Sequence, residues 1–140
     1  MNQRAIQRLQ RNLRRLSWAI ALGAVAYLAW RFETLTLPAG GCSPLFRFQA
    51  GQTLLTDRHP STLAIGDAVL YRASGQVLLG SIEELRGAGR QPISPLASNP
   101  WPHSLWLVTD APDCPGADSR ELGWIPVEDL AARVLLVWPW

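Results

Sequence analysis

The sequence predicts a mainly β protein: a small antiparallel β domain behind one N-terminal transmembrane helix. Residues 16–30 are apolar apart from Ser17, short alternating stretches follow between turns, and no strand–helix–strand pattern occurs. With 140 residues, 48% of them hydrophobic, the chain has room for one domain and one small core. We therefore divide it into an arginine-rich lead (1–15), a transmembrane helix (16–32) and a β domain (33–140).

The formal charge of +2 conceals a division between the two ends of the chain. Residues 1–32 carry six arginines and no acid, whereas residues 33–140 carry seven arginines and eleven acidic residues. Because the basic residues stand beside an apolar segment and the β domain is acidic, a nucleic-acid partner is not expected. The chain has no lysine, so a mechanism that needs a lysine amine lacks it here.

The apolar segment from Leu16 to Trp30 is the predicted membrane helix. Fifteen helical residues fall short of a hydrocarbon core of about 30 Å, but Leu13 and Phe32 extend the segment while nearby arginines snorkel to the headgroups. The lead of residues 1–15 has helical apolar spacing and is predicted to be a cytoplasmic amphipathic segment. Its five arginines place the N-terminus in the cytoplasm and the β domain on the outer side of a lipid bilayer.

Two alternatives remain for this end of the chain. A cleaved signal peptide would use a small-x-small site such as Ala24-Val25-Ala26, although the apolar run continues past that site. A lipoprotein signal is faintly suggested by Ala39-Gly40-Gly41-Cys42, although the cysteine lies far beyond the apolar run. An uncleaved single-pass anchor accounts better for the long arginine-rich lead.

The β domain is predicted from short alternating stretches separated by turns. Ser74-Gly75 marks a hairpin turn, and residues 91–103 contain four prolines that predict a loop. Residues 127–131 are compatible with one helical turn. The predicted strands are residues 34–37, 53–57, 68–72, 76–79, 106–108 and 134–138.

Ser43 is the candidate nucleophile of this domain. It follows Gly41 and Cys42 and precedes Pro44, so it lies where the backbone is expected to turn. The structural alternative is a polar loop residue. Residues 41–52 (Gly-Cys-Ser-Pro-Leu-Phe-Arg-Phe-Gln-Ala-Gly-Gln) resemble the nucleophile box of the type I signal peptidases, Gly-x-Ser-Met-x-Pro-Thr-Leu, which leads after two residues into Gly-Asp. The spacing from Ser43 to Gly51 is the spacing of that box.

Further motifs follow in the order of the same family. Residues 65–72 (Ile-Gly-Asp-Ala-Val-Leu-Tyr-Arg) resemble its Gly-Asp-x-Val-Val-Phe segment. Residues 118–126 (Asp-Ser-Arg-Glu-Leu-Gly-Trp-Ile-Pro) are similar to its Asp-Ser-Arg-x-x-Gly-x-Val-Pro box, which is the most specific match. Residues 134–139 resemble its final strand, so the likeness covers residues 16–140.

The resemblance implies a β-rich serine endopeptidase fold that cuts exported proteins near the bilayer. In this family a serine hydroxyl attacks the peptide carbonyl and a neutral lysine takes its proton. The position of that lysine is occupied here by Gly80, which has no base to offer. The branch of the family in the endoplasmic reticulum uses histidine instead, but neither His59 nor His103 falls at this position.

Other positions of the family pattern also differ in this sequence. Pro44 replaces the methionine after the serine, and Gln52 replaces the aspartate that ends the nucleophile box. Thr109-Asp110-Ala111 stands where the family begins Gly-Asp-Asn. The acyl-transfer site is therefore predicted to be degraded while the scaffold is retained.

The box of residues 118–126 is expected to have a structural role. Asp118 and Arg120 are predicted to form a charge-assisted pair that holds the terminal strands, with Ser119 bonding locally. Gly123 and Pro126 are expected to shape a turn.

Cys42 and Cys114 are the only cysteines of the chain, and both lie on the predicted outer side of the membrane. An oxidising compartment favours a disulfide between them. Two cysteines and two histidines show no metal-ligand spacing, so neither a metal nor another cofactor is expected.

We therefore predict a signal-peptidase-like membrane protein that is noncatalytic and binds an extended exported peptide, or a membrane-protein partner, at the outer bilayer surface. Phe46, Phe48, Trp101 and Trp106 are candidate apolar contacts, with core packing as their alternative role. Two other functions remain open: an active serine endopeptidase with Ser43 and a different base, and a structural subunit of a membrane complex.

Overall fold

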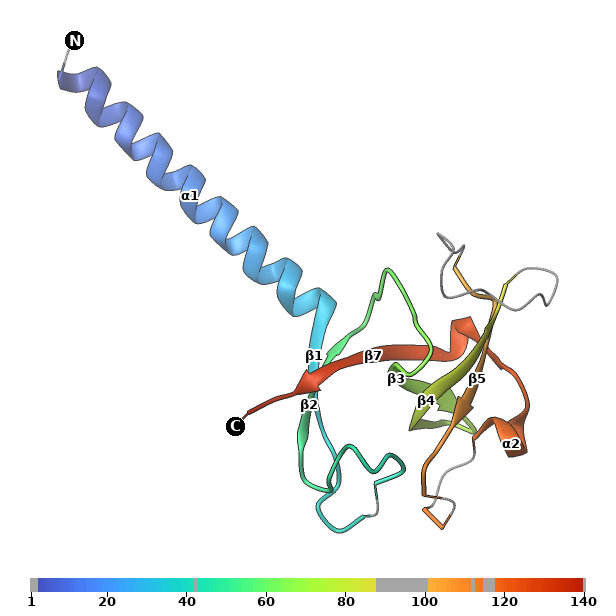
Figure 1. Ribbon diagram of the computed structural model, residues 1–140. Helices are drawn as coiled ribbons and strands as arrows, with labels where there is room; N and C mark the ends of the chain where they lie inside the picture. The colour runs from blue at the N-terminus through green and yellow to red at the C-terminus, as the bar shows by residue number, and fades with distance from the viewer. Residues whose placement is uncertain (1–2, 42, 88–100, 112, 115–117, 140) are drawn as a thin grey trace. The chain divides into compact units, whose positions relative to one another are not determined.

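The computed structural model describes residues 3–41, 43–87, 101–111, 113–114 and 118–139 (Figure 1). The chain divides into two compact units, Met1–Phe32 and Glu33–Trp140. The first unit is a helix and the second is a β domain.

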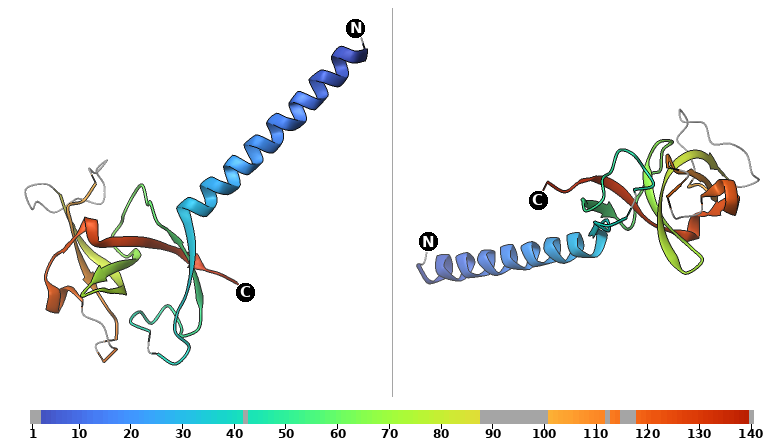
Figure 2. Two further views of the ribbon diagram at one scale, coloured as in Figure 1. Left: turned by 180° about the vertical axis from the view of Figure 1, so that it is seen from behind. Right: turned by 90° about the horizontal axis from the view of Figure 1, so that it is seen from below.

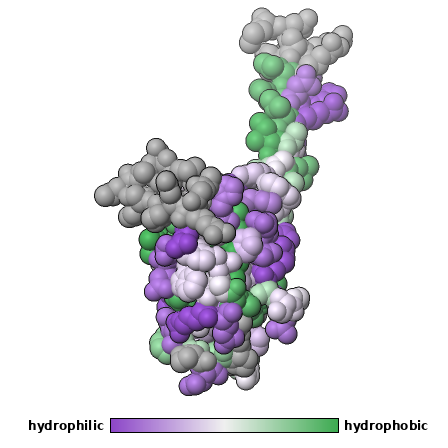
Figure 3. All heavy atoms as spheres, turned by 90° about the vertical axis from the view of Figure 1, so that its right-hand side faces the viewer, coloured by the Kyte–Doolittle hydropathy of each residue, from purple (hydrophilic) through white to green (hydrophobic). Residues whose placement is uncertain are grey.

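Helix α1 (Gln3–Arg31) runs without a break through the predicted lead and the predicted membrane segment. Its last turn is stabilised by Arg31, whose Nη1 donates to the Tyr27 hydroxyl at 2.8 Å and whose positive charge suits a helix C-terminus. Figure 3 shows hydrophobic surface along this helix and a hydrophilic patch toward its N-terminal end. Apolar side chains such as Ile20 and Leu22 are about two-thirds exposed.

The membrane crossing of residues 16–32 stays a prediction. Among the described residues, no helix combines the length and the apolar character that a membrane span needs.

The β domain is built on one seven-stranded sheet with the order β1-β2-β7-β3-β4-β5-β6. The pairs β2–β7, β3–β4, β3–β7, β4–β5 and β5–β6 are antiparallel, which confirms the predicted mainly antiparallel β fold. Figure 2 shows β4 and β5 at the opposite end of the sheet from β1 and β2. The strands are β1 (Phe32–Thr36), β2 (Thr53–Asp57), β3 (Ala68–Ala73), β4 (Gln76–Arg86), β5 (Ser104–Val108), β6 (Ile125–Pro126) and β7 (Leu130–Val137).

The hairpin turn between β3 and β4 lies at Ser74 and Gly75, as predicted. Their φ angles are 51° and 78°, and two successive positive φ angles are typical of the type I′ turn that suits twisted hairpins. The two strands pair without interruption from Ala73–Gln76 to Ala68–Ser81.

Several boundaries differ from the sequence prediction. Strand β4 continues past Leu79 to Arg86, because Leu85 and Ile82 keep pairing with β5 although two glutamates stand between them. The predicted helical turn over 127–131 is a 3-10 turn, η2 (Val127–Asp129), and β7 begins directly after it. The short helix α2 (Ser119–Leu122) was not predicted, and most of the predicted loop 91–103 lies outside the described residues.

The predicted single core is wrong, because the domain has two hydrophobic clusters. Alternating residues of β3 point to opposite faces of the sheet, so Leu70 belongs to one cluster while Val69 and Tyr71 belong to the other. The first cluster comprises Leu37, Leu45, Phe48, Leu54, Ala68, Leu70, Leu79 and Ala132. The second comprises Val69, Tyr71, Ile82, Leu85, Leu105, Leu107 and Ile125.

Replacing Leu45 by Ala tests the packing of the loop that carries Ser43. The Leu45 side chain is fully buried in the first cluster, so its loss should reduce the free energy of unfolding by about 2–5 kcal/mol. Urea unfolding of the full chain in maltoside micelles, followed by tryptophan fluorescence, measures this change. The control Leu136→Ala removes a side chain that is 48% exposed and should change stability by less than about 1 kcal/mol. Equal effects of the two variants would contradict the packing.

Candidate site around Ser43

The segment between β1 and β2 carries Ser43 and is closed at its base by backbone hydrogen bonds. The Leu37 N–H donates to the Gln52 carbonyl at 2.8 Å, and the Gly51 N–H donates to the Leu37 carbonyl at 3.1 Å. Gly51 has a φ of 83°, which a residue without a side chain adopts readily. Leu45 and Phe48 then anchor the segment in the first hydrophobic cluster.

The segment is also tied to the residues that follow β5. The carbonyl of Pro44 accepts hydrogen bonds from the N–H groups of Asp110 at 2.8 Å and Ala111 at 3.3 Å. In return, the Phe46 N–H donates to Oδ2 of Asp110 at 3.0 Å. These reciprocal bonds hold the backbone on both sides of Leu45 against the end of β5.

Arg47 connects the Ser43 segment to two further parts of the domain. Its Nη1 donates to the Gly66 carbonyl at 2.9 Å, and its Nη2 donates to Oγ of Ser81 at 3.2 Å. Gly66 belongs to the second motif, and Ser81 follows Gly80 in β4. The fold therefore brings the first two motifs and the neighbourhood of position 80 together.

The Ser43 hydroxyl is half-buried and forms a hydrogen bond within its own turn. Its Oγ donates to the Leu45 carbonyl at 2.9 Å. A nucleophilic serine instead needs a titratable acceptor at about 2.6–3.2 Å from Oγ, because the hydroxyl is too weakly acidic to react unaided. A backbone carbonyl cannot take a proton at neutral pH, so this arrangement does not activate Ser43.

Position 80 is closely covered by neighbouring side chains. A Cβ atom added at Gly80 would lie 3.1 Å from Cε1 of Tyr71 and 3.4 Å from Cβ of Leu107. Side chains alternate along a strand, so Ser81 points away from this cluster and contacts Arg47. The space that a longer side chain at position 80 would enter first is therefore occupied by the Tyr71 ring.

Tyr71 is fully buried in the second cluster. Burial, together with the negative charge of Asp118, raises the pKa of Tyr71 to about 12. The phenol is consequently neutral at physiological pH and does not serve as a base there.

The two histidines have different surroundings. The backbone of His103 pairs with Arg86 and Val127 at the start of β5, whereas the Ser43 segment contacts the other end of that strand. The five residues of β5 separate these ends by about 16 Å. His59 is exposed, and its backbone N–H donates to Oδ1 of Asp57 at the end of β2.

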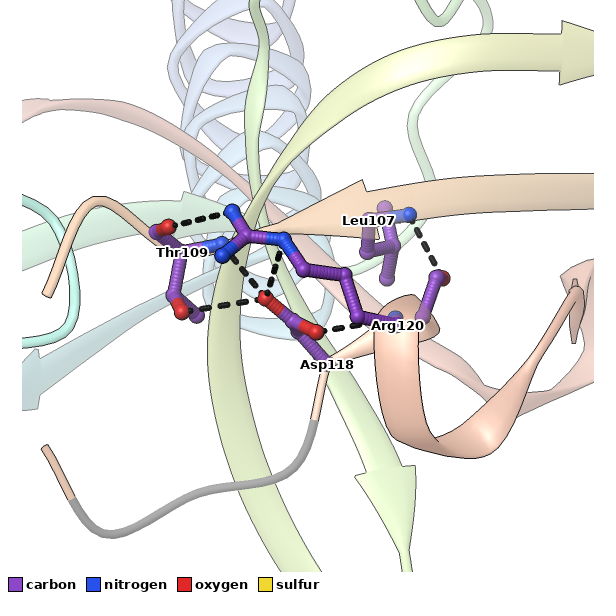
Figure 4. A network of polar contacts seen from close by, with 5 residues as sticks. Leu107, Thr109, Asp118 and Arg120 are labelled. Atoms are coloured by element: carbon purple, nitrogen blue, oxygen red, sulfur yellow. Dashed lines mark hydrogen bonds and ion pairs between the residues drawn. The ribbon is translucent and has the colours of Figure 1, made fainter. Parts of the chain in front are cut away.

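Asp118 is the centre of a buried network beside β5 (Figure 4). Its Oδ2 accepts hydrogen bonds from the N–H and the hydroxyl of Thr109, both at 3.1 Å. Its Oδ1 accepts the Arg120 N–H at 2.9 Å, which makes Asp118 the N-cap of α2. The carboxylate thus joins the end of β5 to the start of a helix.

Ser119 and Arg120 extend the same network along β5. Oγ of Ser119 accepts the Leu107 N–H at 2.8 Å, and Nη2 of Arg120 donates to the Thr109 carbonyl at 3.0 Å (Figure 4). Strand β6 pairs with β5 only at Ser104 and Leu105. The side chains of this box therefore take the place of a neighbouring strand along the rest of the β5 edge.

These contacts correct the expected role of the box. Asp118 and Arg120 contact each other, with Nε of Arg120 at 3.5 Å from Oδ2 of Asp118, but they hold α2 to β5 and not the terminal strands. Ser119 bonds to Leu107 and not locally. Gly123 ends α2 with a φ of 76°, and Pro126 lies in β6 opposite Ser104.

The four aromatic residues proposed as apolar contacts have separate environments. Phe46 is 74% exposed and Trp101 is 43% exposed, whereas Phe48 belongs to the first cluster. Trp106 packs against Trp124 with ring centroids 5.2 Å apart. Only Phe46 is both exposed and part of the Ser43 segment.

Cys114 is disulfide-bonded. Its predicted partner, Cys42, lies outside the described residues, so the pairing of these two cysteines stays a prediction. The described residues contain no group of three or more potential metal ligands.

The sequence did not assign roles to Arg47, Tyr71 and Asp110. Arg47 lies inside the quoted nucleophile box, and Asp110 lies in the stretch that departs from the family pattern, so both stood in segments already singled out. For Tyr71 the only local signal is its alternation with Val69. No protein-family model matches the chain, and no curated protein matches it at a significant level.

The raised pKa of Tyr71 predicts a loss of stability at alkaline pH. The phenol ionises near its ordinary value of 10.0 in the unfolded chain and near 12 in the fold, so the stabilisation holds below pH 10 and is lost as the pH rises toward 12. Urea unfolding at stepwise pH measures this loss, and the absence of lysine keeps other titrations few. Tyr71→Phe should flatten the profile, while the control Tyr27→Phe should not. An unchanged profile in Tyr71→Phe would contradict the assignment.

Installing lysine at position 80 tests whether the Tyr71 ring fills that place. Gly80→Lys should lower the free energy of unfolding by at least about 1–3 kcal/mol through overpacking, and should confer no cleavage of a signal-peptide substrate. Val77→Lys is the control in the same strand, because Val77 is 55% exposed. The double variant Tyr71→Ala/Gly80→Lys should be less destabilised than the sum of its single variants. Full stability of Gly80→Lys would show that the position is open.

Proposed function

We propose that the protein is a noncatalytic relative of the type I signal peptidases that binds an extended segment of an exported peptide. The observation that carries this proposal is the hydrogen bond from Ser43 Oγ to the Leu45 carbonyl, in a domain where position 80 has no side chain and is covered by Tyr71. A serine so engaged does not open an amide bond, but the surrounding strand edge and apolar side chains remain usable for binding.

An open strand edge leads to the Ser43 segment. Strand β4 pairs with β5 from Ser81 onward, whereas residues 76–80 pair in the described part of the chain only with β3. Strand β5 ends at Val108, which pairs with Ser81 of β4. The chain then turns away from β4, and the Asp110 N–H donates to the Pro44 carbonyl. An extended peptide added along residues 76–80 would therefore satisfy free backbone groups and point toward Ser43.

Two exposed apolar side chains belong to the segments that contact β4 at Ser81 and Ile82, just beyond this edge. Phe46 is 74% exposed and Ile65 is 52% exposed, and the bond from Arg47 to Gly66 holds their two segments together. Contiguous exposed apolar surface marks binding sites, and we propose that Phe46 and Ile65 contribute such surface to a peptide that extends past Ser81. They suit the apolar residues of an exported peptide better than a polar ligand.

The outer edge of β5 is not available for the same purpose. Ser119 and Asp118 already accept the N–H groups of Leu107 and Thr109 there. Strand β1 also ends the sheet, but β2, β7 and β3 separate it from β4. The first residues of β4 are therefore the edge that best fits a peptide running to Ser43.

Helix α1 supports the proposed place of this protein at a membrane. Its apolar residues from Leu16 to Trp30 include many that are more than half exposed, and arginines dominate the preceding lead. We propose that α1 anchors the chain with a cytoplasmic N-terminus and an extracytoplasmic β domain. The bilayer would then keep the domain close to peptides that emerge from it.

A structural subunit of a membrane complex is the second candidate. Leu135, Leu136, Val137 and Trp138 are all more than one-third exposed at the end of β7. A protein partner that covered this stretch would bury apolar surface without using the Ser43 segment.

Peptide binding can be tested with the full chain in maltoside micelles. A labelled signal-peptide segment ending in Ala-x-Ala should bind saturably by fluorescence anisotropy and should remain intact by mass spectrometry. Ser43→Ala should change the Kd less than twofold, because its hydroxyl is not expected to contact the peptide as a nucleophile. Cleavage that disappears in Ser43→Ala would establish the alternative of an active serine endopeptidase.

N-methylated peptides test strand addition directly. Two peptides are compared, one N-methylated at odd positions and the other at even positions, so that each lacks every second N–H donor. The peptide that lacks the donors facing β4 should bind at least tenfold more weakly, whereas the other should bind nearly normally. Equal weakening of both peptides would argue against strand pairing. Failure of the unmethylated peptide to bind would favour the structural-subunit candidate.

A further inference from the structure

A pocket of about 210 Å³ lies on the face of the sheet that carries the first hydrophobic cluster. Leu70 and Ala132 belong both to that cluster and to the pocket lining. The segment with Leu45 and Phe48 packs on this face. The pocket is lined by Arg72 and Val77, which pair with each other near the turn of the β3–β4 hairpin. Strands β1, β2, β3, β4 and β7 all contribute to its lining.

The pocket combines an apolar floor with a charged rim. Leu35, Leu70, Val77 and two alanines, at positions 131 and 132, supply apolar surface. Glu33, Arg58 and Arg72 supply the charges. This composition suits an amphiphile better than a fully polar ion.

The charge balance of the rim favours an anion. Nε of Arg58 lies 3.1 Å from Oε2 of Glu33, so these two charges largely neutralise each other. Arg72 has no hydrogen bond or ion pair in the part of the chain that the structure describes. Its guanidinium is exposed, planar and suited to bidentate contact with a phosphate or carboxylate.

The position of the pocket along the chain indicates what that anion is. Glu33 lies two residues after Arg31, the last residue of α1, and β1 follows the helix directly. If α1 is anchored in a bilayer, as proposed above, the pocket begins within a few residues of the lipid headgroups. Its volume is below the range of about 300–1,000 Å³ that is typical of pockets for drug-sized ligands, so it suits a phosphate with the adjoining glycerol and first acyl carbons and not a whole lipid.

We infer that this pocket binds an anionic phospholipid, with the phosphate on Arg72 and the glycerol and first acyl carbons on the apolar floor. The choice of a lipid rests on the proposed attachment of α1 to a membrane, whereas the anion preference rests on the pocket alone. Binding there would orient the β domain on the bilayer surface through a contact separate from Ser43.

The experiment uses short-chain lipids below their micelle concentration, so it does not depend on insertion of α1. The full chain in maltoside micelles is titrated with dihexanoyl phosphatidylglycerol while the methyl NMR signals of Val77, Ala131 and Leu70 are followed. Saturable shifts of these signals are expected, with a Kd at least tenfold lower than that for dihexanoyl phosphatidylcholine. Inorganic phosphate alone should produce no comparable shift at the same concentrations, because it leaves the apolar floor empty.

Two variants and one control connect the shifts to the pocket. Arg72→Ala should raise the Kd for phosphatidylglycerol about tenfold, and Val77→Trp should block binding by filling the floor. Arg14→Ala removes the same charge from α1 and should leave the Kd unchanged. Circular dichroism of each variant establishes that the β domain remains folded.

The remaining outcomes overturn the inference. Equal affinity for the two lipids, or an unchanged Kd in Arg72→Ala, would mean that the pocket does not select an anion. Full saturation by inorganic phosphate would make it a phosphate site and not a lipid site. A failure of this experiment leaves the peptide-binding test untouched, because that test follows a different ligand at the β4 edge.

Discussion

The buried carboxylate of Asp118 is the contact on which the rest of the site depends. It accepts hydrogen bonds from Thr109 and caps α2, and it thereby fixes the end of β5. Asp110, the residue after Thr109, is hydrogen-bonded to Pro44 and Phe46 of the Ser43 segment. A series of hydrogen bonds therefore connects residues 118–126 to residues 41–52. Removing one partner of such a network leaves a buried polar group unsatisfied, which is more costly than losing a surface bond.

The same carboxylate affects what the site can do chemically. Its negative charge adds to burial in keeping the Tyr71 phenol neutral, and the Tyr71 ring lies where a side chain from position 80 would begin. In the proposed relationship to the signal peptidases, position 80 would carry the base, and in this fold the space next to it is part of the second hydrophobic cluster. A larger side chain at Gly80 would therefore have to displace the Tyr71 ring from this cluster.

The sequence predicted the local features of this fold better than the contacts between distant segments. The alternation in β2 and the Ser74-Gly75 turn are local signals, and both elements are present at the predicted places. The extension of β4 was missed because its continuation depends on pairing with β5, which no local pattern contains. The contact between Ser119 and Leu107 was likewise missed, because a hydroxyl that replaces a strand partner is visible only in three dimensions.

The two proposed binding features meet in the first residues of β4. The side chain of Val77 lines the pocket, while its backbone belongs to the strand edge that pairs only with β3 in the described residues. A peptide added to this edge would order the residues that form one wall of the pocket. If the peptide changes the affinity for the lipid in this way, the lipid must change the affinity for the peptide by the same factor, because coupling between two sites is reciprocal. An ordering effect of this sign would make the proposed peptide bind more tightly when the proposed lipid occupies the pocket.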